Sequence, residues 1–148
     1  MAPSTEMKEV EMIHLEHVNL VVNDIDAELA FYGAAFPHWR VRERERGNWY
    51  GKPRTWVHFG DDYQYLAISD FGEGENRNLR GHSVGFAHFA FAINNLHALV
   101  ERMTLAGYKF DHFGPEVQFR KNVYYLDPDG FEIEFVEYLS DDPKERNS

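Results

Sequence analysis

The sequence predicts an α+β fold made of two copies of one β-α-β-β-β module. Segments with the two-residue period of strands surround a segment of helical period, and this order occurs once in each half of the chain. An internal repeat supports the same prediction. When the chain is shifted by 71 residues, residues 17–27 align with residues 88–98, and His, Asn and Ala recur at matching positions. We therefore expect one module over about residues 12–70 and a second over about residues 84–139.

The first module is expected to begin with a strand over residues 13–22, a segment rich in Val and Leu. Asn23 and Asp24 then offer an N-cap for an amphipathic helix that ends before Pro37. Three further strands are expected over residues 39–44, 55–59 and 63–69. A polar, glycine-containing loop over residues 71–83 leads to the second module.

The second module repeats this order. A strand over residues 85–93 precedes a helix over residues 96–105, which Gly107 closes. The remaining strands are expected over residues 108–112, 119–126 and 131–138. The turn at residues 127–130, Asp-Pro-Asp-Gly, is a strong signal because Pro presets φ and Gly accepts a positive φ.

The two ends of the chain are polar and have few apolar anchors. Residues 1–11 and 140–148 are therefore expected to be flexible tails on a single domain that spans residues 12–139. A chain of 148 residues is long enough for one ordinary domain with its own core.

The composition of the chain limits the kinds of molecule that it is expected to bind. The formal net charge is −10, which argues against nucleic acid or an anionic membrane as a partner, because phosphate binding requires clustered Lys and Arg. The absence of Cys excludes disulfides, zinc–thiolate sites and a Cys nucleophile. No apolar run approaches the ~18 residues of a membrane span, and no signal peptide is visible. We expect a cytoplasmic protein.

Side-chain alternation gives each strand one apolar and one polar face. His17 and Asn19 share the polar face of the first strand, His88 lies on the equivalent face in the second module, and Glu132 and Glu134 lie on that of the last strand. A single His on a strand is more often a hydrogen-bonded structural residue. Here, however, the two histidines occupy equivalent positions in the repeat. Two imidazoles and one carboxylate suit Mn²⁺, Fe²⁺, Ni²⁺, Co²⁺ or Zn²⁺ and leave positions open for substrate or water.

Four segments carry a resemblance to a known family. They are His17-Val18-Asn19-Leu20-Val21-Val22, Ala30-Phe31-Tyr32, Gly85-Phe86-Ala87-His88 and Tyr124-Tyr125-Leu126-Asp127-Pro128-Asp129-Gly130-Phe131-Glu132-Ile133-Glu134. On these segments the chain resembles the vicinal-oxygen-chelate superfamily, which includes glyoxalase I, extradiol dioxygenases, fosfomycin-resistance thiol transferases and bleomycin-resistance proteins. The resemblance spans about residues 13–139.

The resemblance implies two paired βαβββ modules that form a curved mixed sheet around a metal-binding cleft. It also implies that His17, His88 and Glu134 are the metal ligands, and so selects Glu134 over Glu132. Tyr124 matches a tyrosine that several members place beside the substrate. Members of this size commonly dimerise, so we expect a homodimer, in which the site lies within one chain or is shared between two.

Some members have a fourth ligand, Glu or Gln, on the last strand of the first module. Ala67 or Leu66 stands at that place here, and Gln64 reaches it only with a slip of register. Three ligands are typical of extradiol dioxygenases and fosfomycin-resistance enzymes. Dioxygenases also carry an acid–base His about fifteen residues before the second metal His. That place is not a His here, and the candidates to replace it are His58, His82 and His112.

The function expected is that of a divalent-metal-dependent lyase, isomerase or thiol transferase that chelates neighbouring oxygens of a small molecule. An extradiol-type Fe or Mn dioxygenase and a non-catalytic, drug-sequestering protein of the bleomycin-resistance type are the alternatives. Tyr124 and Glu132 are the candidates for proton transfer. Four residues are the candidates for binding the substrate, with the arginines suited to an anionic group: Asn19, Arg54, Trp56 and Arg120.

Overall fold

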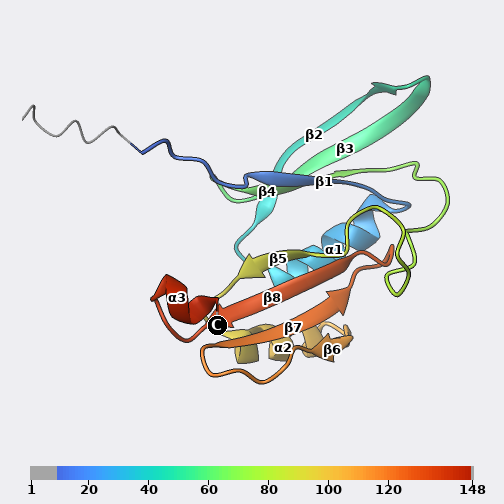
Figure 1. The fold of residues 1–148 in the computed structure, drawn as a ribbon. Helices are drawn as coiled ribbons and strands as arrows, with labels where there is room; N and C mark the ends of the chain where they lie inside the picture. The colour runs from blue at the N-terminus through green and yellow to red at the C-terminus, as the bar shows by residue number, and fades with distance from the viewer. Residues whose placement is uncertain (1–9, 148) are drawn as a thin grey trace, which may run out of the picture.

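The computed structural model describes residues 10–147. It contains two four-stranded mixed sheets and few helices, which confirms the α+β prediction. Each module supplies one sheet, and Figure 1 shows the two sheets as separate layers with a helix between them. Apart from residues 10 and 11, the predicted N-terminal tail lies outside the described residues.

The first sheet has the strand order β1-β4-β3-β2, with β1 parallel to β4 and the other pairs antiparallel. Its strands are β1 (His17–Val21), β2 (Arg40–Trp49), β3 (Lys52–Gly60) and β4 (Tyr65–Ser69). β2 and β3 are longer than predicted, because their charged outer halves pair with each other across the hairpin. The hairpin turns at Tyr50 and Gly51, both with positive φ, and projects beyond the rest of the molecule (Figure 1).

The second sheet has the order β5-β8-β7-β6, with the same parallel pair at one edge. Its strands are β5 (Phe89–Ala92), β6 (His112–Phe113), β7 (Arg120–Leu126) and β8 (Glu132–Tyr138). The strand predicted over residues 108–112 is wrong, since only its last residue belongs to β6. Tyr108 instead donates its backbone N–H to Met103 and closes the preceding helix after Gly107, whose φ is +92°.

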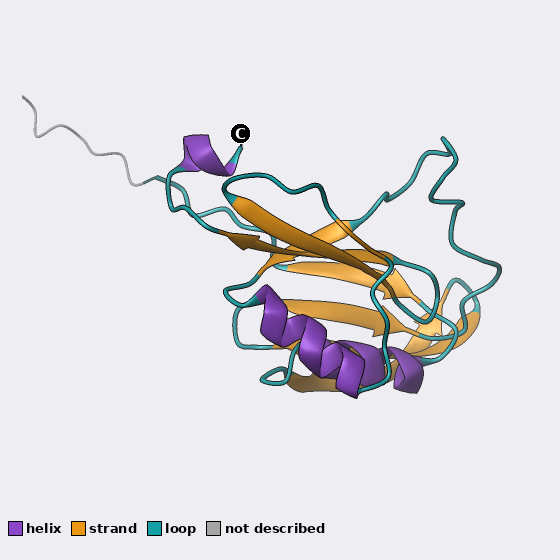
Figure 2. Cartoon of the chain, turned by 90° about the horizontal axis from the view of Figure 1, so that it is seen from below, coloured by secondary structure: helices purple, strands orange, loops and turns teal. Residues whose placement is uncertain are grey.

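Two helices join the sheets into one body. α1 (Ile25–Ala35) is capped by Asp24, whose side chain accepts from two backbone N–H groups of the first turn. α2 (Leu96–Leu105) is capped in the same way by Asn95. The helices pack against each other (Figure 2), and residues of both modules form a single core. Its fully buried members include Tyr32, Leu66, Ile68, Leu99, Met103, Tyr125 and Phe135.

The C-terminal segment, expected to be a flexible tail, ends in one helical turn, α3 (Pro143–Arg146). Asp142 caps this turn, and Arg146 donates to the backbone carbonyl of Ser140 at 2.8 Å. Among the described residues no helix is long and apolar enough to cross a membrane.

Candidate functional site

Each sheet buries one face and leaves the other open. In β1, Leu20 is buried in the shared core, whereas His17 and Val21 on the other face are exposed. In β8, Phe135 is buried, while Glu134 beside it turns to the open face. The alternation along the strands therefore produces two open faces, which carry the polar residues of the two modules.

The open face of the second sheet brings together an imidazole and a carboxylate. His88 directly precedes β5, and its Nε2 atom lies 3.1 Å from Oε1 of Glu134 on β8. The carboxylate is mostly shielded, with 13% of the side chain exposed, while 37% of the His88 side chain is exposed. Asn122 on β7 donates from Nδ2 to Glu134 Oε2 at 3.3 Å. These contacts hold one nitrogen and one oxygen donor side by side.

Tyr124 completes this group. It lies opposite Glu134 in the β7–β8 register, and its ring meets His88 edge-on at 5.3 Å between centroids. Burial, and then the neighbouring Glu134 carboxylate, raise the pKa of the phenol. Tyr124 therefore keeps its proton at neutral pH and can donate a hydrogen bond to an oxygen bound beside it.

His112 extends the same row to β6. It lies opposite Tyr124 in the register, and the two rings stack at 4.4 Å with an interplanar angle of 6°. Its Nδ1 atom lies 2.6 Å from Oδ2 of Asp111, an arrangement that leaves Nε2 open. From the sequence, His112 was one of three candidate acid–base histidines. The sequence could not single it out, because its contact with Tyr124 depends on β6, a short strand that was predicted at the wrong residues.

The open face of the first sheet holds a column of flat groups. The ring of His17 stacks on Tyr65 at 4.7 Å, and His58 stacks on the same tyrosine at 4.5 Å. Arg42 lies over the Tyr65 ring at 4.6 Å. His17 Nδ1 also lies 2.9 Å from a carboxylate oxygen of Glu16. Among residues 10–147, these partners of His17 belong to the first sheet or directly precede it.

The predicted metal triad is therefore divided between two faces. His88 and Glu134 are neighbours, whereas His17 lies on the other sheet. Over residues 10–147, no group of three His, Asp or Glu side chains is arranged to hold a metal ion. The adjacent imidazole and carboxylate fit a divalent transition metal, and a further imidazole from outside this face would complete the set.

The other predicted residues lie at three places. Asn19 follows His17 along the open face of the first sheet, and Arg54 and Trp56 lie farther out, on the projecting hairpin. Arg120 begins β7, opposite Tyr138. Gln64 borders a hollow with Phe36, Trp39 and Phe91, residues that pack on the core, and lies away from the open faces.

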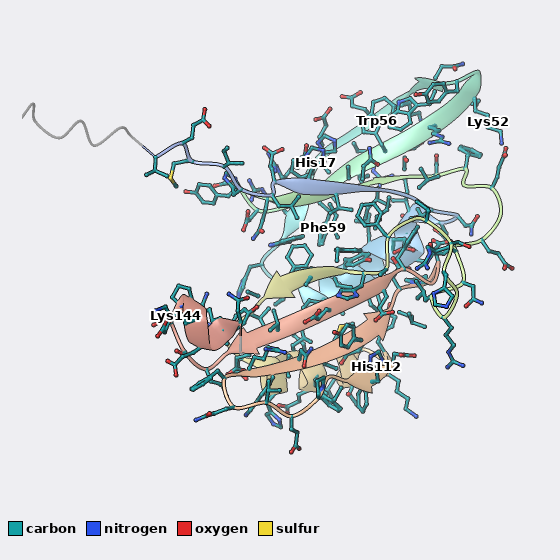
Figure 3. The ribbon with its side chains drawn as sticks, in the orientation of Figure 1. His17, Lys52, Trp56, Phe59, His112 and Lys144 are labelled. Carbon is teal, nitrogen blue, oxygen red and sulfur yellow. The ribbon has the colours of Figure 1, made fainter. Side chains whose placement is uncertain are left out.

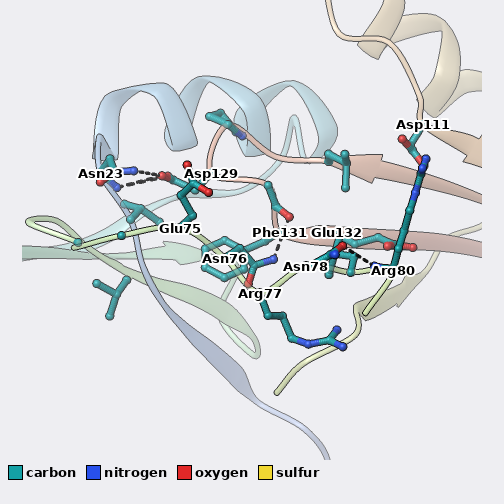
Figure 4. Close-up of a pocket in the computed structure, with 18 of the residues that line it drawn as sticks. Asn23, Glu75, Asn76, Arg77, Asn78, Arg80, Asp111, Asp129, Phe131 and Glu132 are labelled. Carbon is teal, nitrogen blue, oxygen red and sulfur yellow. Dashed lines mark hydrogen bonds between the residues drawn. The ribbon is translucent and has the colours of Figure 1, made fainter. Parts of the chain in front are cut away.

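Glu132 borders a polar cavity of about 1170 Å³ at one end of the second sheet (Figure 4). The loop over residues 72–80 forms one wall, and Asp111 and His112 form part of the other. Arg77 shapes the loop, because its guanidinium donates to the backbone carbonyls of Gly81, Ser83 and Phe86. The cavity thus adjoins the row of polar residues on β6, β7 and β8.

Residues 14–135 match the family model described as the Glyoxalase/Bleomycin resistance protein/Dioxygenase superfamily. The chain belongs to this superfamily. The match covers both modules and includes His17, His88 and Glu134. No curated protein sequence matches the chain.

Solved structures with the superfamily fold resemble the chain over most of its length. A glyoxylase/bleomycin resistance protein/dioxygenase domain from Frankia sp. is 22% identical, with a TM-score of 0.69, and covers 86% of this chain and 99% of its own. A mutant of the fosfomycin resistance protein FosX from Listeria monocytogenes, complexed with Mn(II) and 1S,2S-dihydroxypropylphosphonic acid, is 18% identical, with a TM-score of 0.65 and coverages of 93% and 100%. Lactoylglutathione lyase from Agrobacterium tumefaciens is 23% identical, with a TM-score of 0.54 and coverages of 84% and 92%. At these identities the likeness establishes the fold.

Proposed function

We propose that this protein is a divalent-metal-dependent enzyme that acts on a small molecule with neighbouring oxygen atoms, as a lyase, isomerase or transferase. One observation carries the proposal: His88 Nε2 and Glu134 Oε1 lie 3.1 Å apart on an open sheet face, beside Tyr124. An imidazole and a carboxylate at this spacing are a usual part of a transition-metal site. The Mn(II) complex of the similarly folded FosX supports the same choice of cofactor.

The third ligand in this proposal is His17, supplied by a second copy of the chain. His17 lies on the open face of the first sheet, and His88 and Glu134 lie on that of the second. In a symmetric dimer, the first-sheet face of one copy covers the second-sheet face of the other, and the reverse contact forms a second, identical site. Each site then has two imidazoles and one carboxylate.

A metal bound there would act as a Lewis acid toward the chelated oxygens of the substrate. The chain's own residues have separate tasks. Asn122 orients the Glu134 carboxylate by donating to Oε2. Tyr124 keeps its proton and donates a hydrogen bond to a substrate oxygen. Glu132, at the edge of the adjoining cavity, is the candidate to accept a proton from the substrate.

A second candidate function is that of an extradiol-type Fe or Mn dioxygenase. The Asp111–His112 pair favours it, because this histidine stacks on Tyr124 and keeps Nε2 open for proton transfer. Oxygen consumption with catechol as the substrate separates the two candidates. Uptake of oxygen that requires added Fe²⁺ supports the dioxygenase, and no uptake supports the first proposal.

Metal binding is tested by calorimetric titration of the metal-free protein with Mn²⁺, Ni²⁺, Zn²⁺ and Fe²⁺. The wild type is compared with the variants His88→Ala and Glu134→Gln. Binding to the wild type and a loss of at least about tenfold in affinity in both variants are expected, since each removes one ligand. His97→Ala is the matched control, because His97 lies on α2, away from the open faces. A wild type that binds none of the four ions contradicts the proposal.

A further inference from the structure

The outer half of the β2–β3 hairpin carries aromatic and cationic side chains that the proposed metal site does not use. The rings of Trp49 and Trp56 lie 6.0 Å apart, and the Arg54 guanidinium lies 5.3 Å from the centre of the Trp49 ring. Gly47, opposite Arg54 in the register, makes room for this arrangement. A Cβ atom at Gly47 would lie only 2.7 Å from the Trp56 ring.

Trp49 and Arg54 border a cavity of about 430 Å³ on the open face of the first sheet. Trp49, Lys52 and Arg54 come from the hairpin, Val21 from the end of β1, and Glu73 from the loop between the modules. Lys52 pairs with Glu73, so the two charges compensate each other. The remaining positive charge in the wall of the cavity belongs to Arg54.

The position of the Arg54 guanidinium suits it to bind an anion. Its Nε atom is buried and has no hydrogen-bond partner among residues 10–147. None of the ion pairs found within residues 10–147 includes its guanidinium. A flat guanidinium that lies over an aromatic ring and has an unsatisfied Nε donor suits the geometry of carboxylate and phosphonate groups. An oxyanion in the cavity would satisfy this donor.

The cavity and the proposed metal ligand His17 lie at opposite ends of β1. His17 begins the strand and Val21 ends it, a separation of about 13 Å at ~3.3 Å per residue. Figure 3 shows His17 near one end of the sheet and Trp56 and Lys52 along the hairpin toward the other. Asn19, between the two ends, has its side chain on the same face.

We propose that this cavity binds the carboxylate or phosphonate end of the substrate through Arg54, with the flat body of the substrate against Trp49 and Trp56. The substrate class is then an elongated organic oxyanion whose chelating oxygens lie about 13 Å from its anionic group, the length of β1. The length requirement rests on the proposed metal site. Anion binding by Arg54 does not, because it involves no metal ligand.

The test uses tryptophan fluorescence of the full-length protein in EDTA, with benzoate and phenylphosphonate as probes and benzamide as the uncharged analogue. A saturable change with at least one of the two anions, and none with benzamide, is expected, because Trp49 lines the site and the Trp56 ring lies 6.0 Å from it. Arg54→Met is expected to weaken anion binding by at least about tenfold. The anion that binds more tightly identifies the oxyanion class.

Arg46→Met is the matched control. Arg46 lies on the neighbouring strand of the same hairpin and borders a separate hollow with Asp24 and Asp70. Arg54→Lys is a second variant, which keeps the charge without the planar fork, and a smaller loss of affinity is expected. Circular dichroism checks that the variants fold, and the comparison uses whichever Arg54 variant does.

The proposal is wrong if neither anion binds the wild type, if benzamide binds as tightly as the anions, or if a folded Arg54 variant binds as the wild type does. EDTA removes divalent metal from the assay. Failure of this proposal therefore leaves the metal titration unaffected, and failure of metal binding leaves the fluorescence result standing.

Discussion

Glu28 shows how a single residue can link the stability of this fold to pH. It lies on α1 with its side chain fully buried, and neither carboxyl oxygen makes a hydrogen bond of normal geometry within the described part of the chain. Burial first, and then the nearby Asp129 and Asp127, raise its pKa from 4.5 to about 11. Tyr32 donates to Asp127 Oδ2 at 2.7 Å beside it. These side chains thus form a contact between α1 and the turn that joins β7 to β8, and Glu28 keeps its proton in this contact.

The pKa of Glu28 predicts that the fold loses stability as pH rises. Above pH 4.5 the unfolded chain releases this proton while the folded chain retains it, so the free energy of unfolding falls toward pH 11. Glu28→Gln replaces the ionisable carboxyl group with a neutral amide. The variant is expected to flatten this slope and to raise the free energy of unfolding at pH 8 by at least about 1 kcal/mol. Urea unfolding between pH 5 and 9 measures both effects. Glu101→Gln, on the exposed face of α2, is the control; equal slopes for wild type and Glu28→Gln contradict the account.

Tyr124 is predicted to act on turnover more than on metal affinity. Tyr124→Phe removes the hydroxyl that neighbours Glu134 but leaves His88 and the carboxylate in place. In the reaction that substrate screening identifies, kcat is expected to fall by about 10²–10⁴-fold, and the Kd for Mn²⁺ to change by less than about threefold. Steady-state kinetics and calorimetry measure the two quantities. A large loss of metal affinity with an unchanged kcat would show that the hydroxyl positions the ligands instead.

At the scale of elements, glycine has different roles in the tight connection between β3 and β4 and in helix α1. Gly60 ends β3, and a Cβ atom there would lie 2.0 Å from the backbone oxygen of Gln64. Gly33 lies within α1, and a Cβ atom there would meet no atom of residues 10–147 within 4 Å, apart from its chain neighbours and its own helix backbone. The two glycines therefore have opposite roles, one required by packing and one replaceable.

This contrast predicts opposite effects of the same substitution. Gly60→Ala is expected to destabilise the protein by more than about 2 kcal/mol, because backbone must move. Gly33→Ala is expected to stabilise it by about 0.5–1 kcal/mol through the lower entropy of the unfolded chain. Thermal and urea unfolding of the two variants measure the difference. Equal destabilisation by both substitutions contradicts the packing described for this turn.

Local signals predicted most of the elements. The N-caps Asp24 and Asn95 begin the two helices where the sequence placed them, because a capping side chain acts within its own turn. The strand predicted over residues 108–112 failed, since the helix closure after Gly107 holds Tyr108. The length of the β2–β3 hairpin also escaped prediction, because cross-strand pairing extends both strands. The first error comes from a local helix closure, and the second comes from strand pairing that overrides the local pattern.

The candidate site was predictable only in part. Alternation placed His88 and Glu134 on one face, and the structure brings them together. The separation of His17 from this pair depends on how the two modules pack on a common core, and no local pattern contains that information. His112 was missed as a neighbour of Tyr124 for a related reason, because their contact depends on the pairing of β6 with β7.

At the scale of the whole molecule, one core serves two sheets and leaves two polar faces open. The helices occupy the inner sides of both sheets, so the chain cannot close its own faces onto each other without losing that core. A second copy can cover both faces at once by two-fold symmetry. The proposed metal site therefore forms between two chains, with His17 from one and His88 and Glu134 from the other.

Mixing two inactive variants tests this claim most directly. His17→Ala and His88→Ala are each expected to lose high-affinity Mn²⁺ binding. When they are unfolded together and refolded as a mixture, about half of the dimers contain one chain of each kind, and each such dimer holds one complete site, so about a quarter of the wild-type sites return. Calorimetry and electron paramagnetic resonance count the bound Mn²⁺. Recovery near this fraction confirms a shared site, whereas no recovery in a mixture that mass spectrometry shows to contain mixed dimers contradicts it.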